Sequence, residues 1–400
     1  MVLRRKSVDV LRGFVATRME KAMVSREMSA TRTDLHRASH AAGEIYASKE
    51  IYCREVEVFF MRDWLYVGRV EELANPGDYM TMRIADEPVV IARDKNGELG
   101  AFYNMCAHRG VEVACGSGNT NSFKCPYHGW VYDLDGQLTG AAYMKESAGF
   151  DLKNYRLKLL RLDVWRGNIF INFDQEAEPL LDAVAEFEKD FAFLGWEKCR
   201  LGNRIVLDLE CNWKFVNENL MDFYHVGVLH AKSFGAKFSW TDDNVTLKPD
   251  GGMSIFYDAG PPTPGAEPLL GKMPWLEDRP HSFACTGYRA PNLTFFGRID
   301  CIRPMVAWPI GEARTQVIIY HLFPEEFFDR PDFEDILQIY HDYQILVLEE
   351  DRVMIESMQR AMSSSAYEPG RMSTLEKPMH NFLNGYLERL HGGTARESSK

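Results

Sequence analysis

Cysteine is scarce in this chain of 400 residues, which contains eight. Eight thiols over that length are too dilute for a disulfide scaffold, so free thiols and metal ligands are the better expectation. Long apolar runs are missing too, because no stretch approaches the roughly 20 uninterrupted apolar residues that a membrane-spanning helix needs. Charged residues also interrupt each apolar run of Met1–Met28 before it could form the core of a signal peptide. These absences predict a cytoplasmic protein that does not enter a membrane.

A positively charged surface is missing as well. The formal net charge is −12, and lysine and arginine are scattered among the acids, which excludes a nucleic-acid-binding protein. The chain shows no internal repeat and no dinucleotide fingerprint, so it cannot take a hydride from NAD(P)H by itself. Its length and 46% apolar content are enough for two ordinary domains with cores of their own.

The local patterns change once along the chain. Residues 45–173 contain short β-type runs such as DWLYVGRV and YMTMRI, broken by the turn signals DKNG and DLDG. From residue 178 onward the pattern is mixed: it predicts a helix over 181–194, strands near 204–209 and 316–322, and a long helix over 332–362. An all-β module followed by an α+β domain is the predicted organisation.

Four metal-ligand residues lie in the β module as two matched pairs. Cys106-Ala-His108 is followed, after sixteen intervening residues, by Cys125-Pro-Tyr-His128. One tetrahedral zinc ion takes two cysteines and two histidines, but zinc fingers place like residues together. One cysteine and one histidine in each loop instead suit a two-iron cluster, in which one iron takes both thiolates and the other both imidazoles. We expect glycines 110 and 129 to let backbone amides approach the sulfurs closely.

A second set of metal-ligand residues follows in the α+β domain. Asp222, His225 and His230 lie within nine residues of one another, and two histidines beside an acid favour a metal site. On a regular helix His225 and His230 would lie about 140° apart, too far to share a metal. Something must therefore bend the helix, and Gly227 between them is the predicted position.

The carboxylate that a non-haem iron site requires can come from far along the chain. In the long C-terminal helix, Asp351 is the acid that shares the apolar face, because Val347 and Ile355 fall within about 60° of it. Glu350 lies about 100° away. A buried carboxylate needs a cation, which is either an ordinary salt-bridge partner or a metal.

These motifs together resemble the Rieske non-haem iron oxygenases, the family of aromatic ring-hydroxylating oxygenase α subunits. CAHRG and CPYHGW are similar to the cluster loops of that family, and Trp130 would pack beside the cluster. The segment Asn212-Trp213-Lys214, the pattern Asp222-x-x-His225-x₄-His230 and the distant Asp351 match the family in order and spacing. Respiratory Rieske proteins are less similar, since their loops each add a cysteine to a bridging disulfide.

The resemblance implies a cofactor set and a role for each matching residue. Cys106, His108, Cys125 and His128 would bind one [2Fe-2S] Rieske cluster, and His225, His230 and Asp351 would bind one mononuclear Fe(II). Asp222 would hydrogen-bond His225 and reach a cluster histidine, His128, of a neighbouring subunit. A cyclic homotrimer would therefore pass electrons across its interfaces, with or without an additional β subunit.

The resemblance also implies an α+β architecture. An all-β Rieske domain at 45–168 would precede a helix-grip-like catalytic domain at 169–392, with a large antiparallel sheet and long C-terminal helices. Residues 1–44 would form an arm that packs with the catalytic domain, and residues 393–400 a disordered tail.

The expected function is that of a terminal oxygenase that receives electrons from NAD(P)H through a flavin reductase, a ferredoxin or both. Asp222 lies three positions after Asn219, a spacing that resembles α-only members of the family. Monohydroxylation or N- or O-demethylation of an aromatic substrate is therefore expected first, and cis-dihydroxylation of an aromatic ring second. A Rieske electron-transfer protein without oxygenase activity is the alternative of another class. Candidate pocket residues are Phe256, Tyr257, Phe295, Phe296, Met305, Val306 and Trp308.

Overall fold

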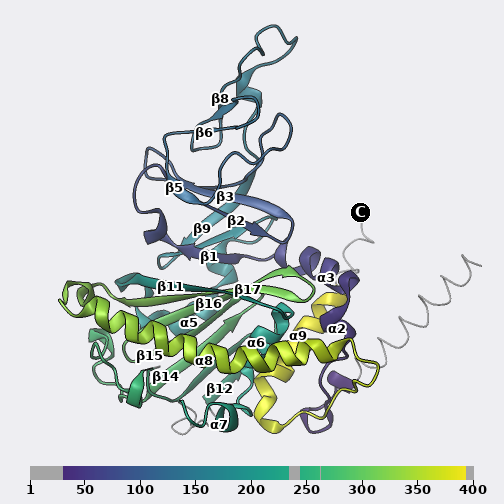
Figure 1. The fold of residues 1–400 in the computed structure, drawn as a ribbon, viewed down its shortest axis with the longest axis vertical. Helices are drawn as coiled ribbons and strands as arrows, with labels where there is room; N and C mark the ends of the chain where they lie inside the picture. The colour runs from purple at the N-terminus through teal and green to yellow at the C-terminus, as the bar shows by residue number, and fades with distance from the viewer. Residues whose placement is uncertain (1–29, 234–243, 262, 393–400) are drawn as a thin grey trace, which may run out of the picture.

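The computed structural model describes residues 30–233, 244–261 and 263–392. Residues 1–29 of the predicted arm and the predicted disordered tail at 393–400 lie outside the described residues. Figure 1 shows two bodies stacked along the long axis, an all-β body above and a larger body of sheet and helices below. The predicted α+β architecture with an all-β first part is confirmed.

The upper body is built on a seven-stranded antiparallel sheet with the order β1-β10-β9-β4-β3-β2-β5. A three-stranded sheet, β6-β7-β8, extends it away from the lower body (Figure 1). Polar turns such as Asp94–Gly97 separate the strands, as the sequence predicts, because their side chains and glycines stabilise tight turns. The strands are β1 (Leu65–Arg69), β2 (Asp78–Ile84), β3 (Glu87–Arg93), β4 (Leu99–Tyr103), β5 (Ser117–Asn119), β6 (Phe123–Lys124), β7 (Val131–Tyr132), β8 (Leu138–Gly140), β9 (Leu159–Trp165) and β10 (Asn168–Asn172).

The lower body contains a second seven-stranded antiparallel sheet with the order β11-β17-β16-β15-β14-β13-β12. Its central strands are buried on both faces, since helices cover each side. The two strands predicted at 204–209 and 316–322 are present and extend further than predicted. The strands are β11 (Cys199–Leu209), β12 (Val245–Leu247), β13 (Met253–Asp258), β14 (Phe283–Arg289), β15 (Leu293–Arg298), β16 (Ile302–Gly311) and β17 (Arg314–Pro324).

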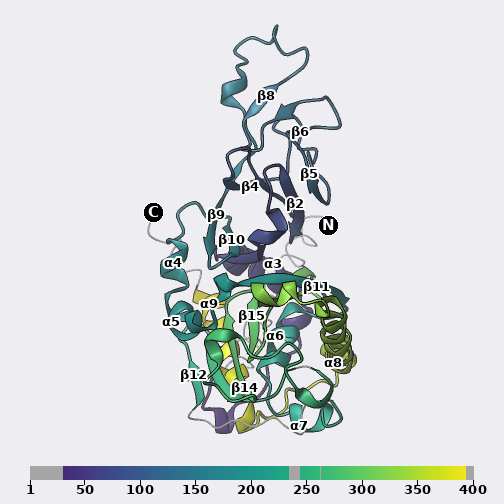
Figure 2. The same ribbon diagram turned by 90° about the vertical axis from the view of Figure 1, so that its left-hand side faces the viewer.

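The helices lie on both sides of the second sheet. Figure 2 shows α8 on one side and α4 and α5 on the other, with α6 between α8 and the sheet. The helix predicted over 181–194 is present as two short helices that meet at Val184, followed by a turn of 3₁₀ helix. The helices are α2 (Glu44–Ala47), α3 (Lys49–Glu55), α4 (Leu180–Ala183), α5 (Ala185–Phe191), α6 (Trp213–Met221), α7 (Val226–Leu229), α8 (Phe333–Met362) and α9 (Lys377–Gly392).

Helix α8 is the predicted long helix. Its buried residues recur every three or four positions, as expected for a helix that packs one face against a sheet. Asp351 belongs to this stripe and is 9% exposed, as predicted from its place on the apolar face. Met354 and Met358, on the edge of the same face, remain 45% and 41% exposed. The buried stripe of α8 therefore covers a narrower part of the helix surface than the apolar face that the sequence predicts.

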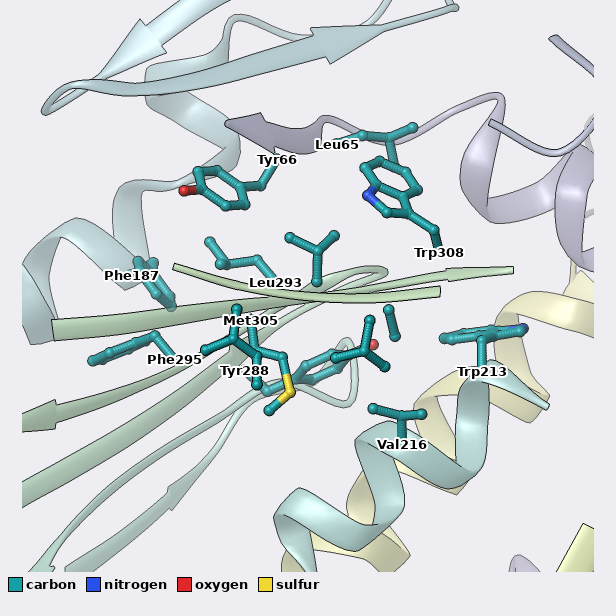
Figure 3. Packing of buried hydrophobic residues seen from close by; sticks show 14 of the residues in the cluster. Leu65, Tyr66, Phe187, Trp213, Val216, Tyr288, Leu293, Phe295, Met305 and Trp308 are labelled. Carbon is teal, nitrogen blue, oxygen red and sulfur yellow. The ribbon is translucent and has the colours of Figure 1, made fainter. Parts of the chain in front are cut away.

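One hydrophobic cluster extends across both bodies. The side chain of Asn292 accepts a hydrogen bond from the backbone of Tyr66 and donates one back to it, at 3.3 and 3.1 Å. The Tyr66 ring packs edge-on against Tyr320 of β17 with centroids 5.4 Å apart. Figure 3 shows Leu65 and Tyr66 above strands of the second sheet, with Leu293 between the layers. This continuous packing fixes the cluster-bearing body on the sheet.

Residues 44–60 pack on the lower body. The buried carboxylate of Glu55 accepts hydrogen bonds from Trp213 at 2.8 Å and Tyr386 at 2.5 Å, and it pairs with the buried ammonium of Lys214. This network anchors the first turn of α6, whose N-cap is Asn212. Residues 44–60 therefore contact the lower body, and the upper sheet ends at Asn172 with β10.

Within the described part of the chain, no helix is both long and apolar enough to cross a membrane.

Candidate metal centres

The two cluster loops fold in the same way. In each loop a glycine amide donates to the carbonyl of the cysteine four residues earlier, at 2.8 Å for Gly110 and Cys106 and 3.0 Å for Gly129 and Cys125. Both glycines have a positive φ, of 77° and 70°. A side chain would meet no backbone at either position, so glycine is needed for the backbone conformation. The amides of the glycines themselves close the turns, and the prediction that the glycines let other backbone amides approach the sulfurs stays a prediction.

The two turns bring the predicted cluster ligands together. Nδ1 of His108 lies 3.1 Å from Nδ1 of His128. The imidazoles are exposed, whereas the cysteines are 3% and 2% exposed. Two imidazole nitrogens that converge in this way suit a shared iron. The arrangement buries the sulfur side of the site and leaves the histidine side accessible to a redox partner.

One zinc ion would need all four donors around a single point, with metal–ligand bonds of roughly 2.0–2.3 Å. In this structure the two imidazoles meet at an exposed position, whereas both cysteines are buried. A binuclear cluster with separate thiolate and imidazole irons fits this division between buried sulfurs and exposed nitrogens.

Trp130 lies beside the cluster ligands, as the family resemblance implies. Its ring stacks on His108 with centroids 4.9 Å apart and planes 11° from parallel. Trp130 is 3% exposed and fixes the orientation of that imidazole.

Tyr132 is a cluster-loop residue that the sequence reasoning missed. Its hydroxyl lies 3.2 Å from Sγ of Cys106 and accepts the amide of Ala107 at 2.9 Å. Burial, followed by the hydrogen bond with Cys106, raises the pKa of Tyr132, so the phenol stays protonated and donates to the sulfur. A Tyr two residues after the tryptophan of the second loop was the available signal.

The Tyr132→Phe substitution is expected to lower the reduction potential of the cluster by roughly 40 mV, since a hydrogen bond of about 1 kcal/mol to a cluster sulfur stabilises the reduced, more negative state. Redox titration of the cluster signal would measure the shift. Tyr155→Phe is the matched control, because this ring also packs against Trp130 but has no bond to a cluster sulfur. Equal potentials for the wild type and Tyr132→Phe would show that the phenol does not tune the cluster.

The second set of ligands also converges. His225, His230 and Asp351 each offer a donor atom, and these atoms all lie within 4.8 Å of one another. Oδ1 of Asp351 is 3.0 Å from Nε2 of His230 and 3.6 Å from Nε2 of His225. Two imidazoles and one carboxylate on one side of a point form the donor set of a non-haem iron centre.

The local fold explains how two histidines five residues apart can meet. Helix α6 ends at Met221, the backbone of Asp222 is extended, and α7 begins after His225. The break therefore lies at residues 222–225. The prediction that Gly227 provides it is wrong, because Gly227 lies inside α7 with open space around it.

Asp222 lies where the sequence predicts it, against His225. Its Oδ2 is 3.0 Å from Nδ1 of His225, although the two groups are not aligned as a hydrogen bond. Its Oδ1 accepts the amide of Tyr224 at 2.7 Å, which holds the carboxylate at the end of α6. The side chain of Asp222 is 21% exposed, so its carboxylate can also contact a group outside the set of His225, His230 and Asp351.

Glu350 is the second residue that the sequence reasoning missed. Its Oε2 lies 2.7 Å from Nδ1 of His230 and accepts the hydroxyl of Ser233 at 2.9 Å. Burial alone would lower the pKa of His230, but the hydrogen bonds and charges of Asp351 and Glu350 outweigh it and raise the pKa. Asn219 donates to Asp351 at 3.1 Å. The ligand side chains are therefore oriented by neighbours, as metal sites require.

Replacing Glu350 with alanine is expected to weaken Fe(II) binding by about 10-fold to 100-fold, because Nδ1 of His230 loses the acceptor that orients the ring. Anaerobic titration of metal-free protein with Fe(II) would measure the affinity. The control is Glu349→Ala, which removes an adjacent acid of α8 that pairs instead with Arg352. If both variants bind iron as tightly as the wild type, Glu350 does not support the site.

A cavity opens onto the three converging donors. One wall comes from helices α6, α7 and α8 and the other from the second sheet. Of the predicted pocket residues, Tyr257, Phe296 and Met305 line it. The predictions of Phe256, Phe295, Val306 and Trp308 are wrong, because alternate residues of a strand point to opposite faces. Phe295, for instance, packs against Phe187 and Phe191 of α5 (Figure 3).

Two family models match parts of this chain. A family model described as the Rieske [2Fe-2S] domain matches residues 63–156, and one described as the ring hydroxylating alpha subunit catalytic domain matches residues 196–392. The carnitine monooxygenase oxygenase subunit of Acinetobacter pittii is 30% identical, over 82% of this chain and 87% of that protein. The chain belongs to the Rieske oxygenase family. Its members are oxidoreductases, and the cofactors of the family are a Rieske cluster and a mononuclear iron.

Two solved structures have the same fold as this Rieske oxygenase. The quaternary ammonium Rieske monooxygenase CntA, in complex with an inhibitor, superposes with a TM-score of 0.75 at 25% identity, covering 91% of this chain and 98% of that chain. Naphthalene 1,2-dioxygenase from Rhodococcus sp. superposes with a TM-score of 0.75 at 19% identity, covering 92% and 97%. The second likeness shows the fold alone.

Proposed function

We propose that this Rieske oxygenase is a terminal monooxygenase that hydroxylates a C–H bond of a small organic substrate. An aromatic compound that is monohydroxylated or loses an N- or O-methyl group is the proposed substrate class. The observation that carries the proposal is the cavity, which places Tyr257, Phe296 and Met305 opposite the three converging metal-ligand residues. An electron carrier has no use for such a cavity or for a second metal site.

The proposed residue roles follow the contacts. Cys106 and Cys125 hold one iron of the cluster and His108 and His128 the other. His225, His230 and Asp351 hold the mononuclear Fe(II), which supplies the position where O₂ is reduced. These ligands lie on the helical wall, so the opposite wall is left to position the substrate.

Electrons are proposed to arrive from NAD(P)H through a reductase, a ferredoxin or both. Asp222 would connect His225 to His128 of a neighbouring subunit in a homotrimer. Its partial exposure and its contact with His225 support this role.

The proposed reaction consumes one O₂, two electrons and two protons. One oxygen atom enters the C–H bond and the other leaves as water. Where the carbon is bonded to nitrogen or oxygen, the resulting carbinol releases formaldehyde and leaves the demethylated product.

A quaternary ammonium compound is the second candidate substrate, because the similar enzymes from Acinetobacter pittii and CntA are named for carnitine and quaternary ammonium oxidation. Cis-dihydroxylation of an aromatic ring is a further alternative. The likeness to naphthalene 1,2-dioxygenase is one of fold alone, so it does not favour this reaction over the other two.

Single turnover of the reduced holoenzyme with ¹⁸O₂ would test the reaction. Candidate substrates are aromatic ethers and N-methyl amines, quaternary ammonium compounds and plain arenes. One labelled oxygen in the product, or formaldehyde in a one-to-one ratio with oxidised enzyme, is the expected result. Two labelled oxygens on adjacent ring carbons would establish a dioxygenase, and reoxidation without any organic product would support the carrier alternative.

A further inference from the structure

Two arginines lie on the sheet wall of the cavity. Arg298 ends β15, and Arg303 of β16 is paired directly with Phe296 of β15. Side chains two apart on a strand, and those directly opposite on its neighbour, share a face. Arg298, Phe296, Arg303 and Met305 therefore form one row on this wall, and all four line the cavity.

Neither arginine makes a direct ion pair in the described part of the chain. Each side chain is 5% exposed. Nη1 of Arg298 donates to Oη of Tyr257 at 2.8 Å and to the carbonyl of Gly297 at 3.1 Å, and Nη1 of Arg303 donates to Gln344. Nε of both side chains is buried without an acceptor. Their acceptors are thus neutral, and donors remain unused.

The groups around Arg298 and Arg303 carry too little negative charge to offset the two positive charges. Burial, followed by the charge of Arg298, lowers the pKa of Arg303 to about 10. The carboxylate of Asp300 bonds to the hydroxyl of Tyr340, and burial raises its pKa to about 6. Burial and the charge of Arg303 lower the pKa of His321 to about 3, so this ring is neutral. Two buried cations therefore face one nearby carboxylate.

Packing on an aromatic ring does not replace the missing anion. The guanidinium carbons lie 5.7 and 5.5 Å from the centre of the Phe296 ring. Such contacts stabilise a cation weakly compared with the cost of burying it without a counter-ion. An arginine presents a fork of donors that matches a carboxylate, which makes an anionic ligand the natural partner.

We propose that the substrate carries a carboxylate that binds Arg298 and Arg303, while its reacting carbon lies across the cavity beside His225, His230 and Asp351. This inference rests on the proposed oxygenase function and names its substrate class. It admits two sources of the carboxylate, an aromatic acid and a zwitterionic betaine. It excludes a purely cationic substrate, which two arginines would repel.

Calorimetric titration of the anaerobic holoenzyme would test the proposal with charged and uncharged partners. The probes are acetate against acetamide, 4-methoxybenzoate against 4-methoxybenzyl alcohol, and γ-butyrobetaine against choline. The first pair fits a cavity of almost any shape, and the other two distinguish the aromatic from the betaine source. In at least one pair the carboxylate should bind about 10-fold to 100-fold more tightly than its partner.

The variants R298Q and R303Q should abolish this preference. R314Q is the control, since it removes an exposed arginine of β17 that pairs with Glu210 outside the cavity. Thermal denaturation of ligand-free protein keeps the test independent of binding: removing a poorly compensated buried charge should leave the melting temperature unchanged or raise it. A lowered melting temperature in both arginine variants with unchanged ligand preference would assign them a structural role.

No preference for a carboxylate in any pair would overturn the proposal. Arginine-dependent binding of a carboxylate that is never oxidised would leave the proposal standing and count against the proposed reaction. Oxidation of a neutral substrate by the wild type, with no preference for the carboxylate in any pair, would support the proposed reaction and overturn this proposal.

Discussion

Replacing Asp351 with alanine is expected to remove the mononuclear iron and leave the cluster intact. Asp351 brings the only carboxylate among the three donors that lie within 4.8 Å of one another in the described residues. Two neutral imidazoles hold Fe(II) poorly without it. Iron should fall from three to two per chain, with acid-labile sulfide unchanged, and O₂-dependent turnover should drop by about 100-fold or more.

The control for this experiment is Asp342→Ala. Asp342 lies on the same helix, where it bonds to Gln338 at the exposed side, so its loss tests any general effect on α8. Full iron content and normal product formation in Asp351→Ala would contradict the assignment of this residue. The helix would then hold Asp351 for an ordinary ion pair with a histidine.

Replacing Asp222 with alanine is expected to keep both metals and to lose coupled turnover. The proposed cluster ligands lie in the other body of the fold, and the proposed iron ligands His225, His230 and Asp351 are untouched. Loss of the carboxylate removes the contact with His225 and the proposed path from a neighbouring subunit. Stopped-flow oxidation of the reduced cluster by O₂ and substrate should slow by about 100-fold.

Asp208→Ala is the control for surface charge, since this exposed carboxylate bonds to Gln316 on β17. A complementation experiment tests the subunit-crossing path directly. Oligomers that mix a Cys106→Ser chain with an Asp351→Ala chain should recover activity that neither variant has alone. Normal product formation by Asp222→Ala, or no recovery in the mixed oligomers, would contradict the electron-bridge role.

The residues proposed as ligands stand out in the sequence because each belongs to a periodic or paired pattern, and the structure brings them together as two groups. The cluster loops repeat one spacing twice, and Asp351 follows from the 3.6-residue period of α8. The fold class followed from the change between β-type runs and mixed segments. Helix and strand positions were predicted well where the pattern was long, as in α8 and β17.

The supporting residues could not be predicted, because they act through tertiary contacts. Glu350 lies on the edge of the apolar face of α8 and reaches His230 only because α6 and α7 are broken at residues 222–225. Tyr132 follows the second cluster loop and contacts Cys106 of the first loop, so only the folded chain brings the two side chains together. In the sequence, Arg298 and Arg303 look like ordinary charged residues of strands. Only the register of β15 and β16 shows that they lie together on one wall of the cavity.

The central claim, that the chain carries a Rieske cluster and a mononuclear iron, is tested most directly by metal and sulfide analysis of anaerobically purified protein, joined to electron paramagnetic resonance of the reduced sample. The account predicts three irons and two acid-labile sulfides per chain with a Rieske-type signal. Two irons and two sulfides would contradict the second site, and zinc without sulfide would contradict both.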